Sequence, residues 1–311
     1  MSLLAILFSL AIEHYYSAVE NFRIYDWISS FANWVKEKFS ATEIWNDTLG
    51  LIATILIPMF ACALIYGLLN EAMGLLGFLF SLLVLVYCVG PKRFIHTAKQ
   101  YIDAGEHEDE HSLKSYANEL LETDDNEINS ETHQKVCEKL INNTNEGILG
   151  IFFWFILLGP MGALMCRMVN VLYTESLQKV SDDDDADSDD KENIAKEEDS
   201  EHNFAEFNNS IRMLYAILLW LPCQITILTF AITGSFVDSL HEWKSRLSND
   251  YLNPKESEET LFRTGLSALQ IEPDSHQYEI STVQEVYALC WRSIIVWVTA
   301  LALLTLAGLT G

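Results

Sequence analysis

The sequence predicts an all-α protein, a polytopic helical membrane protein with four to five spans and a small helical cytoplasmic region. Half of its 311 residues are hydrophobic, these residues gather in long runs almost free of charge, and the 44 acidic residues lie mostly between the runs. A helix needs about 20 mainly apolar residues to cross the hydrocarbon core of a bilayer. The runs that approach or exceed this length are 51–69, 73–90, 148–172, 213–234 and 290–309.

The chain opens with a short apolar segment, Met1 to Ile12, which Glu13-His14-Tyr15 follows at once. Because the segment lacks a basic start and a small-residue cleavage site, we interpret it as retained, either re-entrant or buried against the bundle. Residues 16–41 then repeat aromatic and aliphatic side chains at helical spacing, with Lys and Arg between them. This pattern is typical of a helix at the membrane interface, and an ordinary packed helix explains it equally well.

Two apolar runs joined only by Asn70-Glu71-Ala72 predict a helical hairpin, which completes an N-terminal membrane part at 1–90. Gly90-Pro91 ends its second helix. Three Lys and Arg residues within 92–99 form the strongest local cluster of positive charge, so the positive-inside rule places the helical region 91–147 in the cytoplasm. The remaining parts are a third main span at 148–180, an acidic loop at 181–203, and a C-terminal membrane part at 204–311 with an intervening polar segment at 235–289.

The acidic loop at 181–203 carries twelve acids against two lysines. Such a composition cannot bury enough apolar surface to offset its ordering entropy, so we expect disorder. A calcium-binding EF-hand loop fails here, because Asp190 stands where glycine is needed and Lys196 where a bidentate Glu is needed. If the spans alternate, the wider segment 174–210 lies outside the cell and 235–289 lies inside.

The net charge of −25, with only 19 Lys and Arg, excludes nucleic-acid binding, because the phosphate backbone needs a basic face. His107 and His111 lie four residues apart, a spacing that can hold a metal, but no third ligand at a recognisable spacing accompanies them. No phosphate-binding loop, dinucleotide fingerprint, nucleophile elbow or paired CxxC motif occurs. The sequence therefore predicts no catalytic residue, no metal site and no cofactor.

One cation lies deep in an apolar run. Arg167 follows about twenty mainly apolar residues, and Asn170, three residues further on, shares its helix face. A charge at the centre of a bilayer costs about 2.5–3.5 kcal/mol or more and usually faces the bundle interior with a partner. Glu13, Glu71 and Glu146 are the candidate partners. Alternatively, the guanidinium reaches the membrane interface along its own aliphatic stem.

Proline interrupts two of the apolar runs, at Gly159-Pro160 and at Pro222. Each proline removes a helix hydrogen bond and frees a carbonyl at membrane depth. We expect structural helix breaks at Gly159, Pro160 and Pro222, because facing broken helices can frame a polar site inside a bundle. Simple kinks are the alternative.

A set of motifs lies around these residues in a fixed order. They are Asn142-Asn143-Thr144-Asn145-Glu146-Gly147, Phe152-Phe153, Leu158 to Ala163, Arg167 to Asn170, and Trp220-Leu221-Pro222. This order resembles the CobD/CbiB membrane proteins of cobalamin biosynthesis. The chain departs from their pattern where Asn142 replaces a Glu and Gln224 replaces an Arg. With its 157–164 and 231–236 stretches, it is more similar to a sister branch, the β-lactamase regulator AmpE.

The resemblance implies an inner-membrane protein of a Gram-negative bacterium that acts in the regulation of β-lactamase and the response to cell-wall damage. The corresponding hypothesis is a sensor or modulator that holds a small polar ligand inside the bundle, with the lipid bilayer and a protein of the β-lactamase induction pathway as further partners. The ligand-binding candidates are Glu13, Asn143, Glu146, Arg167 and Asn170. The main alternative is a divergent ATP-dependent amide-bond synthetase of the CobD/CbiB type. A transporter would need a wider polar lining than this sequence offers.

Overall fold

The computed structural model describes residues 4–9, 25–39, 47–89, 92–123, 127–185, 194–246, 253–273 and 277–306. Helices and the short turns between them make up these residues, and no strand occurs among them, so the predicted all-α fold class is confirmed. The helices are α2 (Asp26–Phe39), α3 (Asp47–Ala72), α4 (Gly74–Cys88), α5 (Lys92–Glu106), α6 (Glu110–Leu121), α7 (Ser130–Thr144), the π-helical turn η2 (Asn145–Leu149), α8 (Gly150–Leu158), α9 (Pro160–Asp185), α10 (Ile194–Thr233), α11 (Phe236–Ser245), α12 (Pro254–Ala268) and α13 (Ile280–Leu306).

Three helices are long and apolar enough to cross a membrane, within the part of the chain that the structure describes. They contain the stretches Gly50–Ala72 of α3, Asn209–Thr233 of α10 and Ile280–Leu304 of α13, and α4 is a shorter apolar helix. Large hydrophobic side chains on α3 face outward, with Phe60 71% exposed. A water-soluble protein rarely leaves so continuous an apolar surface uncovered. The chain is therefore a helical membrane protein.

The α3–α4 hairpin follows from the short connection between its two apolar runs. The helix-ending turn is built on Met73, whose N–H donates to the Leu69 carbonyl at 3.0 Å. Gly77 of α4 lies so close to Asn70 that an added Cβ would stand 2.9 Å from its side chain. Residues 4–9 form a further helical turn, and Phe8 packs edge-on against Phe78 of α4.

The apolar run 148–172, in which a break was expected at Gly159 and Pro160, consists of two helices that meet at these residues. The chain runs from α7 through the π turn into α8. Helix α8 ends at Leu158, and α9 begins at Pro160. Gly159 takes φ +69° and ψ −152°, a conformation open essentially only to glycine. The first turn of α9 then presses on α8, because a Cβ on Gly162 would lie 2.2 Å from the Trp154 carbonyl oxygen.

This break reverses the chain rather than kinking it. The amide of Asn170 donates to the Glu146 carboxylate at 3.3 Å, whereas residues 24 positions apart in a straight helix lie about 36 Å from each other. Farther along, Tyr173 of α9 stacks on Tyr215 of α10 at 3.8 Å between ring centroids. Tyr173 and Tyr215, on either side of the segment 174–210, therefore lie near the end of α7. The expected placement of this segment outside the cell stays a prediction.

At Pro222 the expected break does not occur, since α10 continues through it. Proline has no N–H, so the carbonyl of Leu218, one turn earlier, loses its helical donor. The indole N–H of Trp154 on α8 donates to that carbonyl at 3.0 Å. A neighbouring helix thus satisfies the freed group, and the helix stays continuous.

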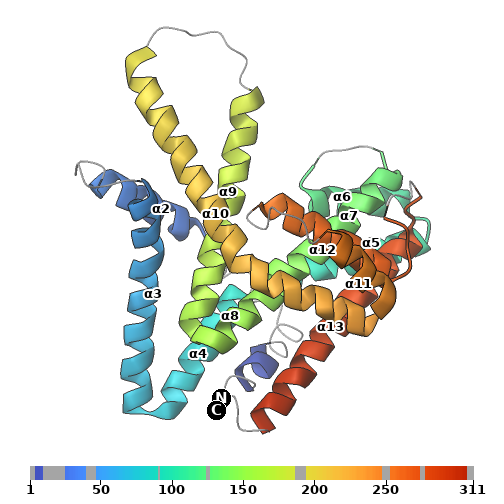
Figure 1. The fold of residues 1–311 in the computed structure, drawn as a ribbon, viewed down its shortest axis with the longest axis horizontal. Coiled ribbons are helices and arrows are strands. Elements are labelled where there is room, and N and C mark those ends of the chain that lie inside the picture. Colours follow the sequence, from blue (N-terminus) through green and yellow to red (C-terminus); the bar gives the residue numbers. More distant parts are fainter. Residues whose placement is uncertain are drawn as a thin grey trace.

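Two apolar cores organise the molecule. The first gathers buried residues of α3, α4, α8, α9 and the first part of the apolar stretch of α10. The second gathers buried residues of α5, α6, α7, α12 and the end of α10. Helix α13 runs from the second core into the first. In Figure 1 the helices of the second core lie to one side of the α3, α4, α8 and α9 group, and α9 and the start of α10 project away together.

The acidic loop and the first acidic candidate fall partly outside this description. Residues 181–185 belong to α9 and residues 194–203 to α10, and the expected disorder of 181–203 stays a prediction. Residues 186–193, and Glu13 near the start of the chain, lie outside the described residues.

Candidate functional site

A cavity of about 900 Å³ opens where the two cores meet. Small-molecule sites in proteins occupy roughly 300–1,000 Å³, so its size suits a small organic ligand. The first core contributes α9 and α10, and the second contributes α5, α6, α7 and α12. Its lining residues are Phe94, Thr97, Glu119, Leu120, Leu121, Glu122, Thr123, Lys135, Glu138, Lys139, Asn142, Asn143, Glu146, Gly147, Arg167, Asn170, Tyr173, Thr174, Leu177, Tyr215 and Glu258.

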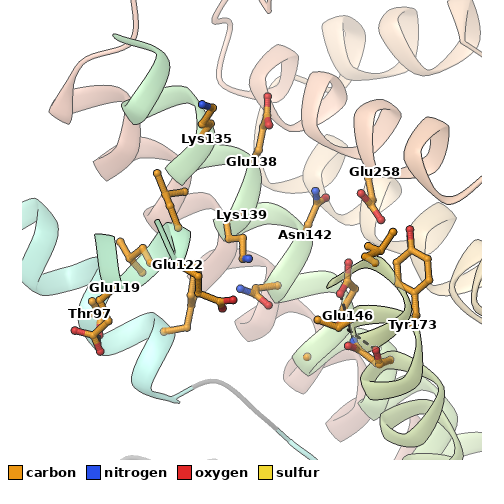
Figure 2. Close-up of a pocket in the computed structure, with 18 of the residues that line it drawn as sticks. Thr97, Glu119, Glu122, Lys135, Glu138, Lys139, Asn142, Glu146, Tyr173 and Glu258 are labelled. Atoms are coloured by element: carbon orange, nitrogen blue, oxygen red, sulfur yellow. Dashed lines mark hydrogen bonds between the residues drawn. The ribbon is translucent and has the colours of Figure 1, made fainter. Parts of the chain in front are cut away.

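One face of α7 supplies much of the polar lining. Lys135, Glu138, Lys139 and Asn142 follow one another at helical spacing, and Glu146 continues the row into the π turn, as Figure 2 shows. Here the N–H of Gly150 donates to the carbonyl of Asn145, five residues earlier. A π turn widens the helix locally, and such turns recur at functional sites. This face is therefore a continuous polar wall.

Glu146 lies at the inner end of this wall. Its carboxylate accepts hydrogen bonds from the Asn170 amide, at 3.3 Å, and from the Tyr215 hydroxyl. Burial raises the pKa of Glu146, while the two hydrogen bonds and the positive charges of Lys139 and Arg167 oppose that rise. The tyrosine is held in turn by its stack on Tyr173.

Arg167 enters the cavity from α9, with an aromatic ring as its neighbour. Its Cζ lies 4.1 Å from the centroid of the Tyr25 ring. Its Nε is buried and has no hydrogen-bond partner among the described residues. Of the three expected acidic partners, Glu146 acts only through its field, and Glu71 lies exposed at the hairpin turn of α3 and α4. Among the described residues, the close neighbour of the Arg167 guanidinium is thus the Tyr25 ring, through a cation–π contact, and a pairing of Arg167 with Glu13 stays a prediction.

Glu258 of α12 brings a second carboxylate to the same cavity. Burial and the nearby charge of Glu146 raise its pKa to about 8, although Lys255 and Lys139 lower it. Beside these acids the Oδ1 atom of Asn142 is buried and has no hydrogen-bond partner in the part of the chain that the structure describes. Buried polar atoms are normally hydrogen-bonded, so this part of the wall presents acceptors that a donor on a bound molecule can use.

Four of the five residues proposed from sequence meet in this cavity, namely Asn143, Glu146, Arg167 and Asn170. Glu13 lies outside the described residues, and the helix-break residues Gly159, Pro160 and Pro222 do not line it. Sequence reasoning missed other lining residues. The helical spacing of Lys135, Glu138 and Lys139 with Asn142 was a usable signal. No sequence pattern pointed to Tyr25, Tyr215 or Glu258.

The lining determines what this site can do. It holds five carboxyl groups and three cations, with amide and hydroxyl groups between them. Among the described residues, no group of three or more His, Cys, Asp and Glu is arranged to hold a metal ion. The arrangement can bind a polar molecule by hydrogen bonds and charge, and it excludes a purely apolar ligand because the buried polar groups would lose water without compensation.

A comparison with known protein families shows which family the chain belongs to. A family model described as CobD/Cbib protein matches residues 3–174. The chain belongs to the CobD/Cbib family. The match spans more than half of the chain and ends at Thr174, so the cavity residues Leu177, Tyr215 and Glu258 lie beyond it. No curated protein and no solved structure is significantly similar to this CobD/Cbib chain.

Proposed function

We propose that this CobD/Cbib family member is a regulatory protein of the bacterial inner membrane that binds a small polar ligand in the cavity and acts in β-lactamase induction and the cell-wall stress response. One observation supports the ligand-binding part above the others. A partly buried carboxylate, Glu146, and the guanidinium of Arg167, whose buried Nε has no hydrogen-bond partner among the described residues, line one cavity of about 900 Å³. Charges are rare inside membrane proteins, and where they occur they usually mark a ligand or ion site.

The contacts of Glu146 suggest how occupancy is transmitted. Its carboxylate is hydrogen-bonded to Asn170 on α9 and to Tyr215 on α10. A ligand that donates to Glu146 competes with these two bonds. The change then reaches the Tyr173–Tyr215 stack that joins α9 to α10. A shift between two packed helices is one of the ordinary routes by which a bound ligand changes a protein's output.

The regulatory role is favoured over synthesis by the residues that depart from the synthetase pattern. Asn142 stands where that pattern has a Glu, and its Oδ1 is buried without a partner. Gln224 stands where it has an Arg, and it accepts a hydrogen bond from the Trp243 indole at 2.9 Å, outside the cavity. Five acids against three cations also suit a nucleotide poorly, since phosphates are held by cationic and N–H donors.

The family match equally accommodates the alternative function, a divergent amide-bond synthetase of cobalamin biosynthesis that uses ATP. The discriminating experiment is direct. Purified protein is incubated with ATP, a corrin carboxylate and an amino alcohol, and amide formation is followed by mass spectrometry. ATP-dependent amide formation would replace the regulatory proposal with the synthetase. The expected result is none above a control without protein.

The site itself is tested by neutralising its two opposite charges. Glu146→Gln and Arg167→Gln keep the approximate size of each side chain, and each is expected to reduce β-lactamase induction in cells at least tenfold. Glu285→Gln and Lys244→Gln make the same charge changes at exposed positions outside the cavity and serve as matched controls. Membrane abundance and size-exclusion profile in detergent report folding. Unchanged induction by well-folded Glu146→Gln and Arg167→Gln proteins would end the proposal.

A further inference from the structure

The guanidinium of Arg167 is the one cation of the cavity that contacts an aromatic ring, among the described residues. Its Cζ stands 4.1 Å from the ring centroid of Tyr25, which directly precedes α2. A guanidinium that stacks by its face keeps its N–H donors free at the edge of the plane. The unpartnered Nε of Arg167 is one such donor. The stack therefore fixes the direction of the donors without using them.

The ring that performs this stacking is itself held in place. The hydroxyl of Tyr25 donates to the carbonyl of Tyr87 at 3.0 Å, and the two rings meet edge-on at 5.4 Å. The indole of Trp27 donates to the Tyr87 hydroxyl at 2.7 Å. One turn further along α2, the hydroxyl of Ser29 donates to the carboxylate of Glu175 on α9. The start of α2 is thus attached to both α4 and α9.

The opposite side of α2 is exposed and aromatic. Trp27 is 39% exposed and Trp34 is 52% exposed, and Trp34 stacks on Phe31. The buried side consists of Ile28 and Val35, which lie a whole number of turns apart. Exposed tryptophans of this kind are typical of helices at the membrane interface. Arg167 therefore links the cavity to a helix that also faces the surroundings of the bundle.

We propose that Tyr25 is a positioning residue for Arg167, and that the docking of α2 and the binding of an acceptor group in the cavity support each other through this contact. The proposal rests on the proposed ligand site and names its regulation. A docked α2 holds the guanidinium edge toward the cavity. An anionic or carbonyl group on the ligand holds the guanidinium in turn, and thereby the ring of Tyr25. By thermodynamic linkage the two effects are equal in size.

The docking half is tested without any ligand, by measuring where α2 lies. All six native cysteines are buried, so cysteines introduced at exposed Asn33 of α2 and exposed Met213 of α10 take spin labels selectively. Pulsed electron resonance on the full chain in lipid nanodiscs gives the distance distribution. Arg167→Gln and Tyr25→Leu are expected to broaden it at least twofold. Tyr25→Phe keeps the ring but loses the hydroxyl bond to Tyr87, so it is expected to broaden the distribution less than Tyr25→Leu does. The control Lys244→Gln is expected to leave the distribution unchanged.

The role of Tyr25 as a positioning residue is tested in the β-lactamase induction assay. Tyr25→Leu is expected to reduce induction as far as Arg167→Gln does. Tyr25→Phe, which keeps the stacking ring, is expected to retain most of the induction, which loss of packing alone would not predict. An unchanged distance distribution in both Arg167→Gln and Tyr25→Leu would overturn the proposal. So would a Tyr25→Phe protein that behaves like Tyr25→Leu. If the distances respond while induction does not, the coupling stands and the regulatory function fails.

Discussion

The contact between Trp154 and the Leu218 carbonyl offers a direct test of how this bundle satisfies its backbone. Pro222 deprives that carbonyl of its helical donor, and the Trp154 indole supplies the replacement at 3.0 Å. Trp154→Phe removes the N–H and leaves the carbonyl unsatisfied at membrane depth. Such a loss costs about 1–3 kcal/mol when the group finds no other partner. Hydrogen bonds between membrane helices are worth at most about 1.7 kcal/mol.

The decisive measurement is a double-mutant cycle with Pro222→Ala. Alanine restores an N–H at position 222, which then donates to the Leu218 carbonyl as in any helix. Trp154→Phe should therefore lower the free energy of unfolding by about 1–1.5 kcal/mol more in the native background than in the Pro222→Ala background. The packing change from indole to phenyl is common to both backgrounds and cancels. Reversible unfolding in mixed detergent micelles, followed by far-ultraviolet circular dichroism, gives the four stabilities. An equal cost in both backgrounds, within about 0.3 kcal/mol, would refute the reasoning.

Two further predictions concern the reversal and the cavity. Gly162→Ala should destabilise the protein by about 3 kcal/mol in the same unfolding assay, because its Cβ would meet the Trp154 backbone oxygen at 2.2 Å. The control Gly67→Ala has open space around the added Cβ and should be neutral or stabilising by up to about 1 kcal/mol. Equal effects of the two substitutions would contradict the steric explanation. Burial raises the pKa of Glu258 from 4.5 to about 8, so the folded state keeps a proton that the unfolded chain has lost. The free energy of unfolding should therefore fall as pH rises through that window, by at most about 1.4 kcal/mol per pH unit. Glu258→Gln should flatten this pH dependence, measured by unfolding between pH 5 and 8. An unaltered slope of unfolding free energy against pH would contradict the burial of this carboxyl.

The cavity residues separate into those that sequence could find and those that it could not. Arg167 and Asn170 were visible because polar groups in an apolar run stand out against a simple background. Glu146 and Asn143 were found through the motif order around them. Glu258 belongs to an ordinary amphipathic helix beside two exposed acids, Glu256 and Glu259, and nothing local distinguishes it. Its place in the cavity depends on how α12 packs against α10 and α7.

The fold likewise has features that the sequence predicts and features that depend on tertiary contacts. Apolar run length alone determined that the protein is helical and built for a membrane, because hydrocarbon tolerates only segments whose backbone groups are satisfied internally. The path of the chain depended on single positions. Gly159 adopts a conformation that reverses the chain, while α10 continues as a helix through Pro222, where Trp154 from another helix supplies the missing donor.

Sequence thus determined which segments are apolar and which polar groups are out of place in them, since both properties are local to the chain. Tertiary structure decided the neighbours of those groups. Arg167 lies on the ring of Tyr25, and Glu146 accepts a hydrogen bond from Tyr215, which lies nearly seventy residues later in the chain. Such pairings depend on helix packing over long sequence separations, which no local pattern records.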